Sequence, residues 1–187
     1  MYLFFDTETT GFFYRDRPLT DPAQPHLCQL GAILTDATGA TQAELNMLVR
    51  PDGWIIPEGA QRVHGISQQH AAKYGVEESQ VVRLFRDLCF LADLLVAHNF
   101  AFDDSILDIA YARYEITKQP RSSYCTMKES TPLCKIPSAR GGYKWPKCTE
   151  AYKHFFGVEF DGAHDAMADV RACKDIFFAI KNYSPSP

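Results

Sequence analysis

Hydrophobic residues along the chain occur in two patterns, short apolar stretches and longer stretches in which they recur at helical spacing. The short stretches predict strands at residues 2–8, 27–35, 43–49, 94–97 and 121–126. Residues 38–40 have the composition of a tight turn between the second and third strands. The first three strands are therefore expected to form an antiparallel meander.

Helical spacing predicts six helices, at residues 57–65, 67–75, 77–92, 102–115, 149–156 and 167–182. Pro57 and Ser67 suit the beginnings of the first two helices, and Gly65 and Gly75 suit their ends. The third helix is expected to bury one apolar stripe, formed by Val81, Leu84, Phe85 and Leu88.

The order of these elements predicts an α/β fold with a mixed sheet, because antiparallel strands come first and later strands alternate with helices. Residues 12–25 and 130–146 contain many prolines and glycines or charges and are predicted to be loops. We expect a single domain over residues 1–183 and a disordered tail at residues 184–187.

Two carboxylates lie one residue apart near the end of the first strand, in Phe4-Phe5-Asp6-Thr7-Glu8. Asp6 and Glu8 are expected to point to the same face, because side chains alternate along a strand. Two like charges on an apolar strand repel each other and cost free energy unless a cation offsets them. The segment therefore predicts a divalent-metal site.

Two aspartates fall on helix faces that are otherwise apolar. At about 100° per residue, Asp103 lies within the apolar arc of its helix, whereas Asp104 and Asp108 lie opposite. Asp169 lies within the apolar stripe of the last helix in the same way. Either aspartate could instead cap a loop or pair with an arginine, but together with Asp6 and Glu8 they favour one shared metal site.

A histidine precedes the last of these aspartates by five residues, in Gly162-Ala163-His164-Asp165-Ala166-Met167-Ala168-Asp169. A single histidine is often structural or simply exposed. Histidine also exchanges protons near neutral pH, so His164 beside a carboxylate cluster is a candidate general base.

The composition is that of an ordinary globular protein, with 46% hydrophobic and 22% charged residues. No apolar stretch is long enough to span a membrane, and Met1 directly precedes the first strand, so a cytoplasmic protein without a signal peptide is expected. The six cysteines form no C-x-x-C pair and are expected to be free thiols. A zinc site formed by Cys134, Cys148 and His154 is the alternative.

The net charge of −4 alone argues against binding to nucleic acid, but the charge is unevenly distributed. Residues 113–153 contain nine lysines and arginines and only three acidic residues. A basic segment beside an acidic cluster suits a metal-dependent enzyme that acts on a polyanion. The alternative is a solvated surface segment without a ligand.

Three motifs occur in a fixed order along the chain: Asp6-x-Glu8, Asn99-x-x-x-Asp103 and His164-x-x-x-x-Asp169. This set resembles the three exonuclease motifs of the DEDD superfamily over residues 2–176. Within this superfamily the chain resembles the epsilon proofreading subunit of bacterial replicative DNA polymerase and its stand-alone relatives. Val63-His64-Gly65-Ile66 extends the likeness, and the position of His164 indicates the histidine branch, DEDDh.

The resemblance implies a ribonuclease-H-like fold, a five-stranded mixed sheet flanked by helices. It implies a 3′–5′ exonuclease that releases 5′-mononucleotides from DNA, preferably single-stranded, with functions such as proofreading or DNA repair. It also implies two Mg²⁺ ions, for which Mn²⁺ can substitute, and His164 as general base. The metal ligands implied are Asp6, Glu8, Asp103 and Asp169.

The resemblance further implies a group of side chains around the terminal nucleotide, namely Thr9, Phe12, His64, Asn99 and Phe102. For the phenylalanines the alternative is ordinary core packing. Lys144 and Lys147, in the basic segment, are expected to contact phosphates near the active site.

Two other functions stay open at this point: trimming of RNA ends or short oligoribonucleotides, and a catalytically silent nucleic-acid-binding module. The chain also departs from the family in its long loop with Arg15 and Arg17, and in Gln29, where many relatives carry glutamate. No polymerase-binding extension is recognised after the last helix, so association with a polymerase is left open, as is the oligomeric state.

Overall fold

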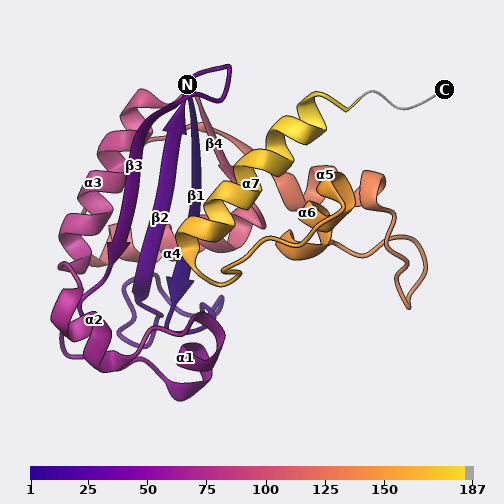
Figure 1. The fold of residues 1–187 in the computed structure, drawn as a ribbon. Helices are drawn as coiled ribbons and strands as arrows, with labels where there is room; N and C mark the ends of the chain where they lie inside the picture. Colours follow the sequence, from indigo (N-terminus) through magenta and orange to yellow (C-terminus); the bar gives the residue numbers. More distant parts are fainter. Residues whose placement is uncertain (184–187) are drawn as a thin grey trace.

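A computed structural model describes residues 1–183, which form a five-stranded sheet with helices on both faces (Figure 1). The strands are β1 (Tyr2–Thr9), β2 (Leu27–Thr35), β3 (Thr41–Leu48), β4 (Leu94–Ala97) and β5 (Ser122–Cys125). Their order is β3-β2-β1-β4-β5; β1, β2 and β3 pair antiparallel, and β4 and β5 run parallel to β1. The predicted mixed sheet is confirmed. The tail expected at residues 184–187 lies outside the described residues.

Helices cover the sheet unequally. They are α1 (Glu58–His64), α2 (Gln68–Tyr74), α3 (Glu78–Leu91), α4 (Phe100–Arg113), α5 (Thr126–Cys134), α6 (Cys148–Phe156) and α7 (Ala166–Lys181). Figure 1 shows α7 crossing one face of the sheet, with α3 and α4 behind the other. The short helices α1 and α2 lie at the end where β1 finishes, and α5 and α6 pack beside α7.

Strand β1 separates two hydrophobic cores because its side chains alternate between the faces. Phe5 packs against Phe85 of α3, with ring centres 5.1 Å apart, and Phe4 packs against Phe177 of α7 at 5.3 Å. Because side chains alternate along the strand, those of Asp6 and Glu8 point to the same face as that of Phe4. The fold therefore directs both carboxylates to the face covered by α7.

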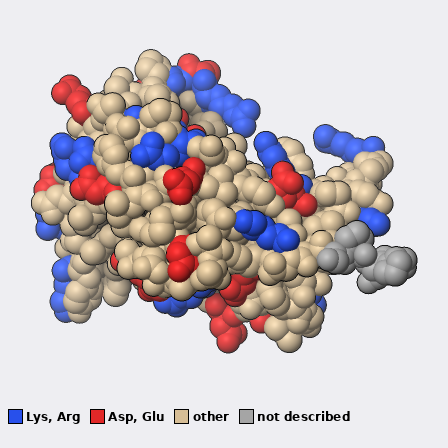
Figure 2. Space-filling model, turned by 90° about the horizontal axis from the view of Figure 1, so that it is seen from above, with Lys and Arg blue, Asp and Glu red and all other residues tan. Residues whose placement is uncertain are grey.

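Figure 2 shows the molecule from the end at which β1 begins, which is remote from Asp6 and Glu8. Acidic and basic side chains are interspersed on this face, and neither sign covers it alone. The excess of basic residues in segment 113–153 therefore does not form a continuous positive area on the face in view.

One helix was not predicted. Residues 130–146 were expected to form a loop, but α5 extends over Thr126–Cys134 and includes Pro132. Its buried residues Thr126, Met127 and Ser130 pack into the fold, and the Thr126 hydroxyl lies 3.0 Å from Nδ1 of His98. Tertiary packing thus overrides a sequence of low helix propensity.

The buried stripe of α3 also differs from the prediction. Leu84 was expected in the stripe but is 46% exposed, whereas Val82 and Cys89 are buried. The helix is rotated because its first turn directs Glu78 inward, where the carboxylate binds Arg113 and the backbone N–H of Leu27. A polar contact at the helix start therefore sets which apolar residues are buried.

Candidate active site

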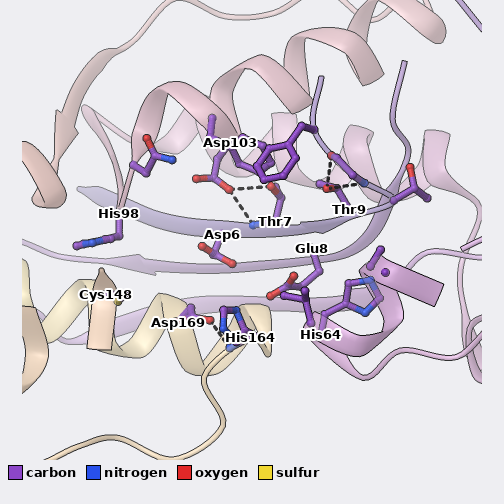
Figure 3. Close-up of a pocket in the computed structure, with 18 residues that line it drawn as sticks. Asp6, Thr7, Glu8, Thr9, His64, His98, Asp103, Cys148, His164 and Asp169 are labelled. Atoms are coloured by element: carbon purple, nitrogen blue, oxygen red, sulfur yellow. Dashed lines mark hydrogen bonds between the residues drawn. The ribbon is translucent and has the colours of Figure 1, made fainter. Parts of the chain in front are cut away.

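Four carboxylates from three elements meet at the end of β1 (Figure 3). Asp6 and Glu8 come from β1, Asp103 from the first turn of α4, and Asp169 from the first turn of α7. In Figure 3 the Asp6 carboxylate lies between those of Asp103 and Asp169. The four groups line one pocket of about 470 Å³. The structure thus brings together all four of the carboxylates that the sequence singled out.

Asp103 reaches this cluster from the opposite face of the sheet and is fixed there by Thr7. The backbone N–H and the hydroxyl of Thr7 both donate to Oδ1 of Asp103, at 3.0 and 2.7 Å. Thr7 points away from Asp6 and Glu8 because the strand alternates. One strand therefore supplies two carboxylates on one side and, on the other, the hydrogen bonds that hold a third.

The electrostatic environment opposes ionisation of the cluster. Burial, and then the charges of Asp103 and Asp169, raise the pKa of Asp6 well above its ordinary value. Burial raises the pKa of Glu8 to about 8 and that of Asp103 to about 7, and it also raises the pKa of Asp169. Among the described residues, no lysine or arginine lines the pocket to offset these charges.

The residues present fit a divalent cation. Oxygen ligands from carboxylates are those that Mg²⁺ and Mn²⁺ prefer, and a bound cation would relieve the repulsion within the cluster. One ligand atom each from Glu8, His164 and Asp169 lies within 4.8 Å of the others. The donor set of this pocket therefore suits a divalent-metal centre.

His164 lies at the entrance of α7 in a strained backbone conformation. Its φ angle is +71°, and its backbone N–H donates to Oδ2 of Asp169 at 2.8 Å. The side chain is exposed and lines the pocket. A non-glycine residue in the left-handed region costs free energy, and such residues concentrate at functional sites. The predicted proximity of His164 to the carboxylates is found in the structure.

Gln29 fastens the segment that carries His164 to the sheet. This buried amide donates from Nε2 to Oδ2 of Asp165 at 3.0 Å and to Oδ1 of Asn46 at 2.9 Å. Its Oε1 accepts from the backbone N–H of Ala166 at 3.2 Å. Gln29 thus holds the start of α7 through two hydrogen bonds and is itself tied to β3 through the third.

Gly31 lets α7 approach the sheet beside Asp6. It is the direct cross-strand neighbour of Asp6, so both residues face the same side. A Cβ atom at position 31 would lie 2.9 Å from the carbonyl carbon and 3.0 Å from the oxygen of Ala166. The missing side chain therefore fixes how closely Asp169 comes to Asp6.

The side chains expected around a terminal nucleotide also lie at this pocket. Thr9, Phe12, His64, Asn99 and Phe102 all line it. Nδ1 of His64 accepts from the backbone N–H of Ile66 at 3.0 Å, so Nε2 carries the proton in the neutral ring. This Nε2 is buried and has no hydrogen-bond partner among the described residues. The imidazole of His64 therefore lies at the pocket wall with this nitrogen turned inward.

Lys144 and Lys147 do not line the pocket. The Lys144 ammonium binds Oε1 of Glu150 at 2.5 Å, and the backbone N–H of Lys147 donates to the other carboxylate oxygen at 2.8 Å. The charge of Lys144 is therefore already partnered. A role in phosphate binding stays a prediction for both lysines.

Several pocket residues were not predicted as part of this site, among them Thr7, His98 and Cys148, of which Cys148 was considered only for the alternative zinc site. Nε2 of His98 donates to the carbonyl oxygen of Pro146 at 3.0 Å and so ties the loop before α6 to β4. Burial, followed by the charges of Cys173, Asp169 and Asp6, raises the pKa of the Cys148 thiol. The position of Thr7 between two acids was the one signal available for these residues.

The cysteines agree with the expected free thiols. All six are unpaired. Within residues 1–183, the group that could hold a metal contains Glu8, His164 and Asp169, and the alternative group of Cys134, Cys148 and His154 is not found. No helix in the described part of the chain has the length and apolar character needed to cross a membrane.

Comparisons with known proteins agree with this geometry. A family model described as an exonuclease, RNase_T, matches residues 3–177. A Mycobacterium tuberculosis protein whose name proposes exonuclease and endonuclease activities is 28% identical over an alignment of 183 positions, which covers 96% of this chain and 26% of that protein. Exodeoxyribonuclease I of Escherichia coli is 26% identical over an alignment of 207 positions, gaps included, which covers 98% of this chain and 40% of that protein. The chain thus spans less than half the length of these relatives.

Solved structures show the same fold. E. coli exonuclease I in complex with a dA16 oligonucleotide superposes with a TM-score of 0.77 at 23% identity, over 98% of this chain and 41% of that one. The zinc-bound form of that enzyme with single-stranded DNA gives a TM-score of 0.76 at 25% identity, over the same shares of the two chains. The expected ribonuclease-H-like arrangement is therefore confirmed.

Proposed function

The chain belongs to the exonuclease family RNase_T, as the resemblance to DEDD exonucleases predicted, and from this premise we propose that it is a metal-dependent 3′–5′ exonuclease. Its substrate would be single-stranded DNA, from which it releases 5′-mononucleotides. The observation that carries the proposal is the meeting of Asp6, Glu8, Asp103 and Asp169 with His164 in one pocket. A silent binding module would have no use for buried carboxylates whose pKa values are raised at the expense of stability.

The four carboxylates would hold two Mg²⁺ ions, for which Mn²⁺ can substitute. The chemistry that such a pair supplies is stabilisation of the charge on the attacking and leaving oxygens. Thr7 keeps the Asp103 carboxylate in place through its two hydrogen bonds, and Gln29 and Gly31 fix the position of α7 and hence of Asp169. These contacts preorganise the acidic cluster before substrate arrives.

His164 would accept a proton at an imidazole nitrogen from the attacking water. Its exposed side chain at the pocket edge allows that water to reach it. The hydrogen bond from its backbone to Asp169 keeps the ring beside the carboxylates. A His164→Ala variant should therefore lose on the order of a hundredfold to ten-thousandfold in rate while it retains metal and DNA binding.

The terminal nucleotide would occupy the part of the pocket formed by Phe12, Phe102 and the imidazole of His64. Aromatic rings accept any base, which suits removal of any 3′ nucleotide. The hydroxyl of Thr9 and the amide of Asn99 would add polar contacts from β1 and from the start of α4.

DNA is favoured over RNA as substrate because one relative is an exodeoxyribonuclease and was solved with dA16 and dT13 oligonucleotides. The test uses 5′-labelled DNA and RNA of identical sequence, with Mg²⁺ or with EDTA. A ladder that shortens from the 3′ end, 5′-mononucleotide products and faster loss of DNA are expected. Full activity in EDTA, or cleavage at internal positions, would contradict the proposal, and faster loss of RNA would make trimming of RNA the function.

A further inference from the structure

An aromatic ridge separates the active-site pocket from a second hollow. The ridge consists of Phe12, Phe13 and Phe102; the ring centres of Phe12 and Phe13 lie 5.9 and 6.1 Å from that of Phe102. Phe12 is 84% exposed on the pocket side. On the other side, a hollow of about 320 Å³ lies between α4 and the loop that follows β1. A chain that leaves the pocket across the ridge enters this hollow.

The loop lines the hollow with aromatic and guanidinium groups, from Tyr14, Arg15 and Arg17. Tyr14 is 48% exposed, and the guanidinium carbon of Arg17 lies 4.7 Å from the centre of its ring. The guanidinium of Arg15 lies 5.6 Å from the ring of Phe13. Exposed aromatic rings beside positive charges are the groups with which proteins bind single-stranded nucleic acid.

Hydrogen bonds brace the loop despite its length. Gln24 is buried at its centre; its Oε1 accepts from the backbone N–H of Tyr14 at 3.0 Å, and its Nε2 donates to the carbonyl oxygen of Tyr14 at 2.8 Å. At the base, Thr10 and His26 exchange two hydrogen bonds, each of 3.0 Å. A braced surface loses little conformational entropy when a ligand binds.

The positive charges of Arg15 and Arg17 are largely not offset by acidic residues. Within the described residues, Arg15 forms no ion pair, and the one partner of Arg17 is Asp21 at 3.7 Å. Asp16 lies between them in the sequence and is exposed. An exposed pair of this length contributes little, so the guanidinium of Arg17 remains available to a phosphate.

The acid on the helix side of the hollow is already partnered. Asp108 of α4 binds the ammonium of Lys118 at 2.7 Å and so opposes an anion less than a free carboxylate would. In the basic segment, the positive charge of Lys144 is likewise offset, because its ammonium is bound to Glu150. Positive charge without a partner is therefore found on the loop rather than at Lys144.

A different exit from the pocket is less suitable. A hollow of about 630 Å³ on the far side of His64 is lined by residues such as Asn46, His70, Tyr74 and Asp165. No lysine or arginine is among its described lining residues, and Asp165 would repel phosphates. The loop side thus offers the better path for a polyanion.

We propose that the loop surface formed by Tyr14, Arg15 and Arg17 binds the single-stranded DNA immediately upstream of the 3′ nucleotide. Tyr14 stacks on a base, and the two arginines contact neighbouring phosphates. This inference rests on the proposed function, which places the 3′ end among the carboxylates. It adds a substrate-binding site outside the pocket and predicts that substrate length matters.

The experiment measures binding of a fluorescent oligothymidylate of about twelve nucleotides in EDTA, at several salt concentrations. Because each phosphate contact contributes about 0.7 to the slope of log affinity against log salt for single strands, the Arg15→Ala/Arg17→Ala variant should flatten that slope by roughly 1.4. Tyr14→Leu should weaken binding roughly tenfold with the slope unchanged. The Leu side chain keeps the loop packed, and Gln24 binds only the backbone of Tyr14.

The matched control is Arg83→Ala, an exposed arginine of α3 that should leave affinity and slope unchanged. Turnover of a thymidine 5′-phosphate aryl ester, which is too short to reach the loop, should be equal in all variants. An unchanged affinity and slope in the double variant would overturn the loop proposal. Wild-type protein that binds the oligonucleotide normally but degrades none of it would overturn the proposed function instead, and the binding comparison would still decide the role of the loop.

Discussion

Glu78 and the carboxylates at the end of β1 are all largely buried, yet their surroundings are opposite in character. Glu78 is 2% exposed and binds His26, Arg113 and Tyr114, as well as the backbone of Leu27. Burial alone would raise its pKa, but the hydrogen bond from His26 and the charge of Arg113 hold that pKa below its ordinary value. The carboxylate is satisfied by the protein itself.

At the end of β1 the charged neighbours of Asp6 and Glu8 are other carboxylates. Asp6 faces Asp103, Asp169 and Glu8, and its pKa is raised by burial and by these charges. Without a cation, the repulsion between these carboxylates is not offset, so a positively charged ligand would stabilise their ionised form. A buried acid paired with basic groups suits a structural role, whereas buried acids grouped together without a basic partner suit a binding site.

Among the variants that test this contrast, the largest effect is expected for a substitution of Asp6. Asp6→Asn should lower the exonuclease rate on the order of a thousandfold or more. It should also raise the metal-free stability, by about 1.4 kcal/mol for each pKa unit of repulsion that it relieves. Both are measured on one preparation, by oligonucleotide degradation and by urea unfolding in EDTA.

The matched control for Asp6→Asn is Asp104→Asn. Asp104 adjoins Asp103 in the sequence but lies on the outer side of α4, where it binds Lys118 at 2.6 Å. This variant should leave the rate unchanged and should not gain stability. Asp6→Asn protein that is both active and no more stable than wild type would mean that the repulsion at β1 has no functional role.

Glu78 should respond in the opposite way. Glu78→Ala leaves Arg113 without its carboxylate in a largely buried position, which is expected to cost about 3–5 kcal/mol of stability. The rate per folded molecule should stay within a few-fold of wild type, because Glu78 does not line the pocket. Urea unfolding gives the first quantity, and activity corrected for the folded fraction gives the second. A large loss of rate in fully folded protein would show that Glu78 acts on the active site.

The pH dependence of stability should also distinguish Glu78 from the carboxylates at the end of β1, although the expected effect is smaller. Glu8 and Asp103 have pKa values raised to about 8 and about 7, so the metal-free folded state binds more protons than the unfolded state from about pH 4 upward. In EDTA, stability should therefore fall as pH rises from 5 to 8, by up to about 1.4 kcal/mol per pH unit for each group. Glu78, whose pKa is lowered, contributes stability that is lost only as pH falls below this range.

The measurement is urea unfolding at pH 5, 6, 7 and 8, in EDTA and in saturating Mg²⁺. Bound metal should remove most of the decline, since it stabilises the ionised carboxylates. Asp6→Asn should make the profile in EDTA less steep. A metal-free stability that rises with pH over this range would contradict the raised pKa values.

The grouping of the four carboxylates could be predicted from the sequence because its signals are local. Strand alternation placed Asp6 and Glu8 together, and helix phase marked Asp103 and Asp169 as acids on apolar faces. The mixed sheet followed from the order of strands and helices. These features depend on periodicity within one element, which a sequence displays directly.

The features that were missed depend on contacts between distant elements. Helix α5 forms because Thr126, Met127 and Ser130 are buried, and nothing in their local sequence indicates it. The rotation of α3 that exposes Leu84 depends on Glu78 meeting Arg113, which lies 35 residues away. The ion pair of Lys144 with Glu150 was likewise missed, because a net charge does not show which residues pair.

Gly31 has a consequence for how this sequence can evolve. The atoms that a side chain at position 31 would meet are backbone atoms of Ala166 and Met167, which every residue type possesses. No substitution at positions 166 or 167 can therefore make room, so the glycine has no compensating partner with which it could covary. In a mutational scan, position 31 should tolerate substitution as poorly as Asp6, although it contributes no reactive group.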